Sequence, residues 1–275
     1  MKKILNTGPS PRGWHRLQLA LECPQKYGWH YEVGLGQQGD KKNDSPPLIK
    51  GSLIHLALAH HYSQIKAMQN DEDPAEFEDP CIAMEVVAKE NGEAWEKEVD
   101  TCRKTFLAYL EHYSSENLKI LEVERLAYTS IQGHVFTGRF DLIYEDRRGK
   151  IWVCDHKTTG RLHSKQRQFY GISGQLTGYA YMAAQIYGDK FAGVILNQIQ
   201  HVAPYKFARN PLPPAPNLLH RFPQIVVDAE SVIKGCKESG RSPRNWPMAA
   251  NELTCFSRYG ACPYLERCTW GYQEK

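Results

Sequence analysis

The chain has 275 residues, which is enough for one large domain or for a core with a small appendage. Apolar residues make up 41% and charged residues 24%, as in ordinary soluble globular proteins, and no run approaches the ~18 consecutive apolar residues of a membrane span. The net charge of +3 is compatible with a nucleic-acid partner but is no evidence for one. At the N-terminus, two lysines precede only the apolar pair Ile4 and Leu5, whereas a secretory signal requires about 7–15 apolar residues, so we expect a cytoplasmic protein.

The first part of the chain is predicted to be helical. Residues 36–47 are polar and rich in turn formers and predict a loop. Residues 51–69 predict a helix because apolar side chains recur at helical spacing along one face, at Ile54, Leu58, Tyr62 and Ile65. An acidic loop with two prolines at 71–80 and a second helical region from about Ile82 to Tyr113 follow.

The middle of the chain predicts a sheet. Residues 119–128, 134–144 and 151–157 each favour a strand, and their short connections predict an antiparallel meander. Residues 172–187 predict a helix and 191–199 a buried strand, so a crossover should place this strand in the same sheet.

The last part of the chain predicts a proline-rich loop at 210–217, a helix at 218–239 and a tail that contains cysteines. We therefore expect an α/β protein in which helices flank a mixed central sheet. Residues 1–117 would form a helical region, residues 118–200 the core, and residues 201–275 a C-terminal helix and the cysteine tail.

Two aspartates and a lysine point to metal chemistry. Asp155 ends a very apolar strand, where an ionised carboxylate is costly unless something compensates it, and a divalent cation is one such compensation. Alternation along the strand places Lys157 on the same face as Asp155, and Asp141 lies within the preceding strand. Hydrolysis of a phosphodiester uses a metal that activates water and an ammonium that stabilises the developing oxyanion. The alternative is a surface salt bridge between strands.

Four short motifs occur in a characteristic order: Gly51-Ser52-Leu53-Ile54-His55, Gly138-Arg139-Phe140-Asp141, Asp155-His156-Lys157-Thr158-Thr159-Gly160 and Gln175-Leu176-Thr177-Gly178-Tyr179-Ala180. With them the sequence resembles the RecB-type branch of the PD-(D/E)XK nuclease superfamily, from about residue 15 to the C-terminus. The resemblance implies a restriction-endonuclease-like core within a single nuclease domain that spans residues 1–275.

The resemblance also implies a site that binds Mg²⁺ or Mn²⁺. His55, Asp141, Asp155 and the backbone carbonyl of His156 would bind the metal, and Lys157 would be the catalytic lysine. Without the resemblance, His55 is typical of a core histidine. Aspartate at the second acidic position, Asp155, is an accepted variant in this family.

Three more residues receive roles from the resemblance. Gln175 and Tyr179 are four residues apart on one helix face and would contact the substrate or support the site. Glu124 matches an acidic residue of the first core strand that would support the metal or the lysine. Taken alone, the first two are ordinary helix residues and Glu124 a charge on a strand surface.

The cysteines indicate a second metal site. Cys255, Cys262 and Cys268 lie within the last 21 of the 275 residues, and such spacing in a reducing compartment favours a metal or cluster over disulfides. The resemblance adds Cys23 as a fourth ligand of a [4Fe–4S] cluster. Six residues separate Cys255 from Cys262, whereas the family usually has two, so structural zinc remains an alternative, as do buried free cysteines.

The function that we expect is a DNA exonuclease or flap-type nuclease that acts on single strands or ends. Basic side chains that would contact the substrate are Arg139, Arg161, Lys165 and Arg167. The alternatives are a catalytically silent DNA-binding or assembly module of the same fold, and an RNA nuclease. The sequence has no G-x-x-x-x-G-K-[ST] phosphate loop, so any unwinding would come from a helicase or recombination partner. The small size favours a free-standing nuclease of a bacterium or phage, as in phage recombination systems or CRISPR spacer processing.

Overall fold

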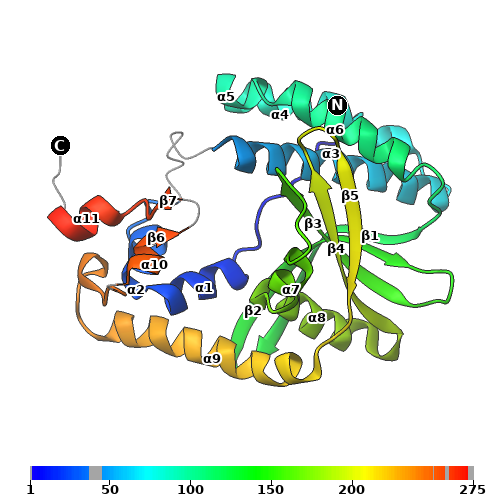
Figure 1. The fold of residues 1–275 in the computed structure, drawn as a ribbon. Coiled ribbons are helices and arrows are strands. Elements are labelled where there is room, and N and C mark those ends of the chain that lie inside the picture. The colour runs from blue at the N-terminus through cyan, green and yellow to red at the C-terminus, as the bar shows by residue number, and fades with distance from the viewer. Residues whose placement is uncertain (1, 37–44, 250, 258–259, 272–275) are drawn as a thin grey trace. The chain divides into compact units, whose positions relative to one another are not determined.

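Five strands form one sheet in the computed structural model, which describes residues 2–36, 45–249, 251–257 and 260–271 (Figure 1). They are neighbours in chain order: β1 (Lys119–Ile131), β2 (His134–Glu145), β3 (Ile151–Thr159), β4 (Phe191–Gln200) and β5 (Lys206–Leu212). β2 and β3 pair antiparallel, β3 and β4 parallel, and β4 and β5 antiparallel. The predicted α/β class with a mixed sheet is therefore confirmed.

The chain divides into two compact units, and we describe each by itself. The sheet unit consists of Met1–Ser10, Asp44–Thr129 and Thr137–Phe222. The cysteine unit consists of Pro11–Asn43, Ser130–Phe136 and Pro223–Lys275. The predicted subdivision of the chain after residues 117 and 200 stays a prediction.

A helical crossover makes β3 and β4 parallel, because parallel neighbours cannot be joined by a tight turn. The crossover contains α7 (Gln166–Gly171), α8 (Gly174–Tyr187) and the 3₁₀ helix η3 (Gly188–Lys190). α8 and β4 confirm the predicted helix and buried strand. All ten residues of β4 except the first two are buried, which explains its continuous apolar run.

Helices α3 (Pro46–Gln69), α4 (Pro80–Asn91), α5 (Glu93–Glu96) and α6 (Val99–His112) precede the sheet, and the 3₁₀ helix η2 (Pro74–Glu76) lies in the predicted acidic loop. The second helical region, expected from Ile82 to Tyr113, is thus divided in three. Gly92 ends α4 in a left-handed conformation, with φ of 94°, which glycine adopts without steric penalty.

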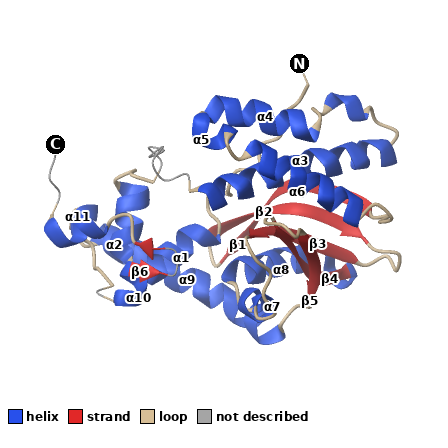
Figure 2. Cartoon of the chain, turned by 45° about the horizontal axis from the view of Figure 1, so that its top comes forward, coloured by secondary structure: helices blue, strands red, loops and turns tan. Residues whose placement is uncertain are grey.

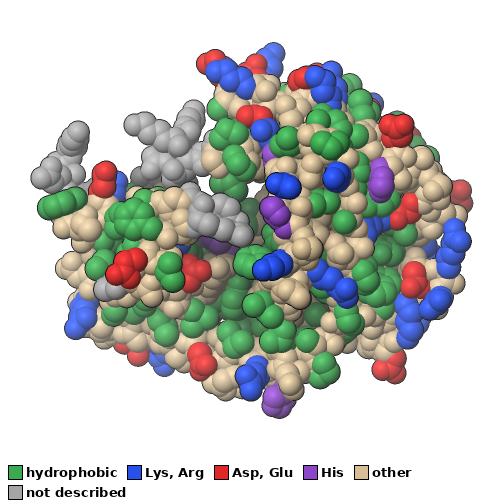
Figure 3. Space-filling view, in the orientation of Figure 1, with side chains coloured by type: hydrophobic (Ala, Val, Ile, Leu, Met, Phe, Trp, Pro, Cys, Tyr) green, Lys and Arg blue, Asp and Glu red, His purple; other side chains and the backbone are tan. Residues whose placement is uncertain are grey.

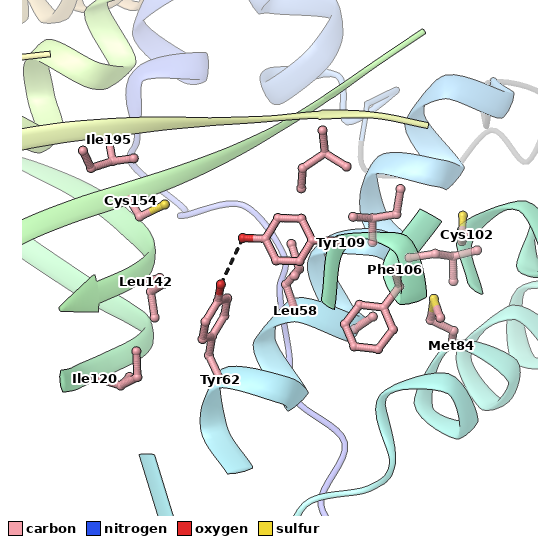
Figure 4. Packing of buried hydrophobic residues seen from close by; sticks show 14 of the residues in the cluster. Leu58, Tyr62, Met84, Cys102, Phe106, Tyr109, Ile120, Leu142, Cys154 and Ile195 are labelled. Atoms are coloured by element: carbon pink, nitrogen blue, oxygen red, sulfur yellow. Dashed lines mark hydrogen bonds between the residues drawn. The ribbon is translucent and has the colours of Figure 1, made fainter. Parts of the chain in front are cut away.

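The core of the sheet unit lies between α3, α4, α6 and one face of the sheet. Leu58 and Tyr62 of α3, Met84 of α4 and Phe106 of α6 pack on buried residues of the strands, which include Ile120, Leu142, Cys154 and Ile195 (Figure 4). In Figure 2 these helices lie above the sheet, and α7 and α8 lie below it. Both faces of the central strands are therefore covered.

Two predicted loops differ from the structure. β5 extends to Leu212 and so includes part of the loop expected at 210–217. Pro211 is tolerated there because β5 is an edge strand, where a missing N–H removes no necessary ladder bond. The helix predicted at 218–239 is α9 (Pro216–Glu238). Of the loop predicted at 36–47, residues 37–44 lie outside the described residues, and α3 begins at Pro46.

The cysteine unit combines segments from both ends of the chain. Its N-terminal segment forms α1 (Trp14–Glu22), α2 (Pro24–Tyr27) and the π-helix η1 (Gly28–Glu32). Arg16 of α1 makes a bidentate ion pair with Glu230 of α9, at 2.6 and 2.8 Å. The later elements are η4 (Pro243–Asn245), α10 (Glu252–Cys255), β6 (Phe256–Ser257), β7 (Gly260–Ala261) and α11 (Leu265–Trp270). Among the described helices, none has the length and apolar character that spanning a membrane requires.

Candidate functional site

The candidate site lies where the ladder between β2 and β3 ends. Backbone pairing runs from Glu145 and Ile151 to Leu142 and Cys154 and then stops. Beyond that point, the carboxylate of Asp141 accepts the backbone N–H of His156 at 2.7 Å. Because a side chain replaces a ladder partner, the strands separate, and the side chains around Asp141 have room to converge.

Asp155 and Lys157 lie on one face of β3, as alternation predicted. The ammonium nitrogen of Lys157 lies 2.9 Å from one carboxylate oxygen of Asp155 and 2.7 Å from the other. Asp155 is 1% exposed. Burial alone would lower the pKa of Lys157, but the carboxylates of Asp155 and Asp141 outweigh burial and raise it. The lysine is therefore a cation that its neighbours keep protonated, held at the end of the strand.

His55 of α3 reaches the same place from the helix. Its Nε2 donates to the backbone carbonyl of His156 at 2.9 Å, and Nδ1 lies 3.5 Å from a carboxylate oxygen of Asp141, so that in the neutral ring Nδ1 is the nitrogen free to bind a metal. A histidine that binds a metal commonly donates its other N–H to a carbonyl in this way. The carbonyl of His156, predicted to bind the metal itself, is engaged with His55 here, and its metal-binding role stays a prediction.

Glu124 of β1 completes a group of three potential ligands. Its carboxylate, His55 and Asp141 each offer one ligand atom, and these atoms lie within 4.8 Å of one another. Glu124 has φ of 50°, a conformation that costs a residue other than glycine about 1–3 kcal/mol. Its Oε2 is buried and has no hydrogen-bond partner among the described residues, and Arg139 Nε is 3.9 Å away. A strained, buried carboxylate with an unsatisfied oxygen fits a site for a divalent cation.

The electrostatics of Glu124 agree with this fit. Burial and the nearby charge of Asp141 raise the pKa of Glu124 to about 9. Without a compensating cation, its side chain is therefore protonated at neutral pH. Two close carboxylates that cannot both ionise alone can both ionise when a divalent cation lies between them.

Gln175 and Tyr179 of α8 lie beside the site and contact each other. Gln175 Nε2 donates to the hydroxyl of Tyr179 at 3.0 Å. Tyr179 is 7% exposed, and burial, together with the charges of Asp155 and Asp141, raises the pKa of its hydroxyl well above the usual value. Gly138 explains why α8 approaches so closely, because a Cβ at this position would lie 2.4 Å from Met182 Cε and 2.9 Å from Tyr179 Cε1.

On the face of the sheet that is opposite to Asp155 and Lys157, β4 carries a polar residue that was not predicted from the sequence. Asn197 of β4 is fully buried, and its amide contacts the ring of His156 at 2.8 Å. Burial lowers the pKa of His156 to about 3, so this ring is neutral. The available signal was an amide in an otherwise apolar strand, Val194-Ile195-Leu196-Asn197.

The segment after β3 carries three of the four basic residues expected to contact substrate. Arg161, Lys165 and Arg167 are exposed, and none of them makes an ion pair within the described part of the chain. Phe169 and Ile172 of the same segment are 53% and 73% exposed. Arg139, the fourth basic residue, is instead half-buried between Glu124 and the backbone carbonyl of Asn6.

The four predicted cluster cysteines line one pocket of the cysteine unit. Cys23, Cys255, Cys262 and Cys268 share it with Lys26, Met248, Thr254, Tyr264 and Leu265. The backbone N–H of Cys262 donates to the carbonyl of Cys255 at 2.7 Å, which fixes the tight return between them. Burial raises the pKa of the Cys262 and Cys268 thiols. All eight cysteines, each within the described residues, are free of disulfides.

The family model for the PD-(D/E)XK nuclease superfamily matches residues 14–269. No curated protein matches the sequence. Among solved structures, the chain is similar to one described as "Crystal structure of SSO0001", with 15% sequence identity, a TM-score of 0.33, and coverage of 67% of this chain and 86% of that chain. The family model is that of the superfamily as a whole, so the RecB-type branch stays a prediction.

Proposed function

This chain belongs to the PD-(D/E)XK nuclease superfamily, and from this premise we propose that it degrades DNA, from single strands or ends, with Mg²⁺ or Mn²⁺. The superfamily itself implies hydrolysis of phosphodiester bonds with a divalent metal and a nucleic-acid substrate. The observation that carries the proposal is the convergence of His55, Glu124 and Asp141 beside the pair of Asp155 and Lys157.

The residues of the site would have separate roles in metal binding and in catalysis. His55 Nδ1 and the carboxylates of Asp141 and Glu124 would hold the cation, with Asp155 as a further ligand, since its carboxylate lies close enough to Asp141 for the two charges to interact. When bound, the cation would activate a water and neutralise charge on the phosphate. Lys157, kept protonated by its neighbours, would stabilise the oxyanion that develops in the transition state.

The segment between β3 and α8 supports the proposed preference for single strands. Arg161, Lys165 and Arg167 would contact phosphates, since cationic side chains supply most of the affinity for a nucleic-acid backbone. Phe169 exposes an aromatic ring only 12 positions after Lys157, and an aromatic face stacks on a base that is not already stacked within a duplex. Figure 3 shows Lys, Arg and His side chains gathered in the middle of the face that carries α7 and the end of β3.

We also propose a [4Fe–4S] cluster in the cysteine unit. The support is the pocket that all four cysteines line. No three of these described cysteines bring their sulfurs within 4.8 Å of one another. Four thiolates on one zinc ion, each at about 2.3 Å, would lie about 3.8 Å apart. A cluster spaces its thiolates more widely because each binds a different iron, and the iron and zinc contents of the purified protein would distinguish the two metals.

The test is digestion of end-labelled single-stranded DNA with Mn²⁺ by the wild type and by Asp155→Asn. Asp228→Asn, on the exposed face of α9, makes the same chemical change away from the site and serves as the control. We expect degradation by the wild type and the control and none by Asp155→Asn. A folded wild type that binds DNA without cutting it would replace the proposal with a silent binding module. A matched RNA strand in competition would show which nucleic acid is preferred.

A further inference from the structure

Three polar side chains form a row across the sheet on the face that α3 and α6 cover. His156 of β3 pairs in register with Asn197 of β4, and Asn197 pairs with Arg209 of β5. His156 is 2% exposed and Asn197 0%, and the side chain of Arg209 is 13% exposed. The row lies among the apolar residues of the core, which include Cys154, Ile195 and Ile199.

Asn197 links this row to the helices. Its Nδ2 donates to Nδ1 of His156 at 2.8 Å and to the hydroxyl of Tyr109, on α6, at 3.0 Å. With the amide in this orientation its nitrogen donates, Nδ1 of His156 accepts, and the ring carries its proton on Nε2. Tyr109 also accepts from Arg209 at 2.7 Å and bonds to the hydroxyl of Tyr62 at 3.0 Å, the bond drawn in Figure 4.

Arg209 anchors the outer end of the row. It donates to Tyr62 at 2.8 Å, makes an ion pair with Glu116, and places its guanidinium 4.0 Å from the ring centroid of Tyr113. With so many partners, the guanidinium holds Tyr109 in one position, and Tyr109 in turn holds the amide of Asn197. The contacts therefore run without a break from Arg209 to the ring of His156.

The peptide of His156 is held by the candidate metal site at the same time. Its N–H donates to Asp141, and its carbonyl accepts from His55. The ring and the backbone of His156 are thus both held by contacts. A displacement of His156 would move its N–H and its carbonyl together, and with them the two potential ligands that they contact.

Stability alone does not account for such a network. Replacing a buried polar network by apolar groups of similar shape is often neutral for stability or even favourable. In this network Asn197 Oδ1 and Arg209 Nε are buried without a hydrogen-bond partner among the described residues, which costs stability, while the remaining bonds hold the members in one arrangement. Here the member at the end of the network is the residue between Asp155 and Lys157.

We propose that Asn197 is a positioning residue. It holds the ring of His156 and thereby fixes the place of the backbone N–H and carbonyl of His156, which contact Asp141 and His55. This inference rests on the proposed function of that site. Partners of this kind behind a metal site typically change metal affinity or activity about 10–100-fold when they are removed.

The test is Asn197→Leu, which removes the amide at nearly constant volume. Mn²⁺ affinity is measured by calorimetry without nucleic acid, and kcat and KM are measured with single-stranded DNA. We expect Mn²⁺ affinity or kcat to fall about 10-fold or more, while KM for DNA stays within about 3-fold. Mn²⁺ binding and kcat that equal those of the wild type would overturn the proposal, whatever happens to the melting temperature.

A pair of tyrosine variants serves if Asn197→Leu does not fold. Tyr109→Phe removes the hydroxyl that Asn197 binds, whereas Tyr144→Phe removes the hydroxyl of another buried tyrosine of the same core, which bonds neither to Asn197 nor to Tyr109. Only Tyr109→Phe should weaken Mn²⁺ binding, and equal effects of the two variants would overturn the proposal. A wild type that binds Mn²⁺ but does not cut would refute the proposed function, while the affinity measurements would still decide the role of Asn197.

Discussion

Glu124 should make the metal-free protein less stable as the pH rises. Its pKa is about 9 in the folded protein, whereas a carboxyl group of an unfolded chain has a pKa of about 4.3. Between these values the folded state holds a proton that the unfolded state has released. The free energy of unfolding therefore falls as the pH rises through this window, because the unfolded state binds fewer protons than the folded state.

The size of this effect follows from the linkage relation. One proton that is bound only in the folded state changes the free energy of unfolding by up to about 1.4 kcal/mol per pH unit. From pH 6 to pH 8 the contribution of Glu124 is therefore up to about 3 kcal/mol. Glu124→Gln removes it, because glutamine has nearly the shape of the protonated side chain and does not titrate.

The assay is urea unfolding of wild type and Glu124→Gln in EDTA at pH 6, 7 and 8. The difference between the two proteins isolates Glu124, since other titrating groups are common to both. The free energy of unfolding of the variant should exceed that of the wild type by a margin that grows by up to about 3 kcal/mol from pH 6 to pH 8. Mn²⁺ should stabilise the wild type more at pH 8 than at pH 6, because binding must displace the proton. Parallel pH curves for the two proteins would refute the reasoning about this carboxyl group.

Three further changes test other parts of the structure. Lys157→Ala should reduce cleavage at least about 100-fold but leave Mn²⁺ binding, measured by calorimetry, near that of the wild type. Gly138→Ala should lower the free energy of unfolding in urea by about 1–3 kcal/mol, because the new Cβ would lie 2.4 Å from Met182 Cε and 2.9 Å from Tyr179 Cε1. An unchanged urea midpoint would show that α8 can move away from β2 without a cost in stability. Cys262→Ala should lose bound iron and lower the melting temperature of anaerobically purified protein, whereas Cys236→Ala should keep the iron; equal iron in both would refute the cluster.

The elements that follow a simple period could be predicted from the sequence. The strands alternate, β4 is a continuous apolar run, and the helix between β3 and β4 favours a crossover, so three consecutive strands and a fourth strand in the same sheet could be predicted. The pairing of Asp155 with Lys157 is also local, because two residues of one strand share a face. These features are determined by residues that lie close together in the sequence.

The features that could not be predicted depend on contacts that are distant in the sequence. β5 lies in a segment whose prolines favour a loop, and it is a strand because β4 offers an edge to pair with. The left-handed conformation of Glu124 and its place beside His55 depend on the packing of β1 and α3. The importance of Asn197 depends on its register with His156, which no local pattern encodes.

The composition of the cysteine unit has a consequence for the order in which the protein can mature. Cys255 follows Cys23 by 232 positions, and the two long segments of the sheet unit, Asp44–Thr129 and Thr137–Phe222, are synthesised between them. At about 5–20 residues per second, a ribosome needs roughly 10–50 s to make that interval. Until Cys255, Cys262 and Cys268 have been synthesised, Cys23 lacks its three partners in the pocket, so the pocket can close only after the strands of the sheet have been made. The proposed cluster would therefore be loaded after the synthesis of the sheet and not during it.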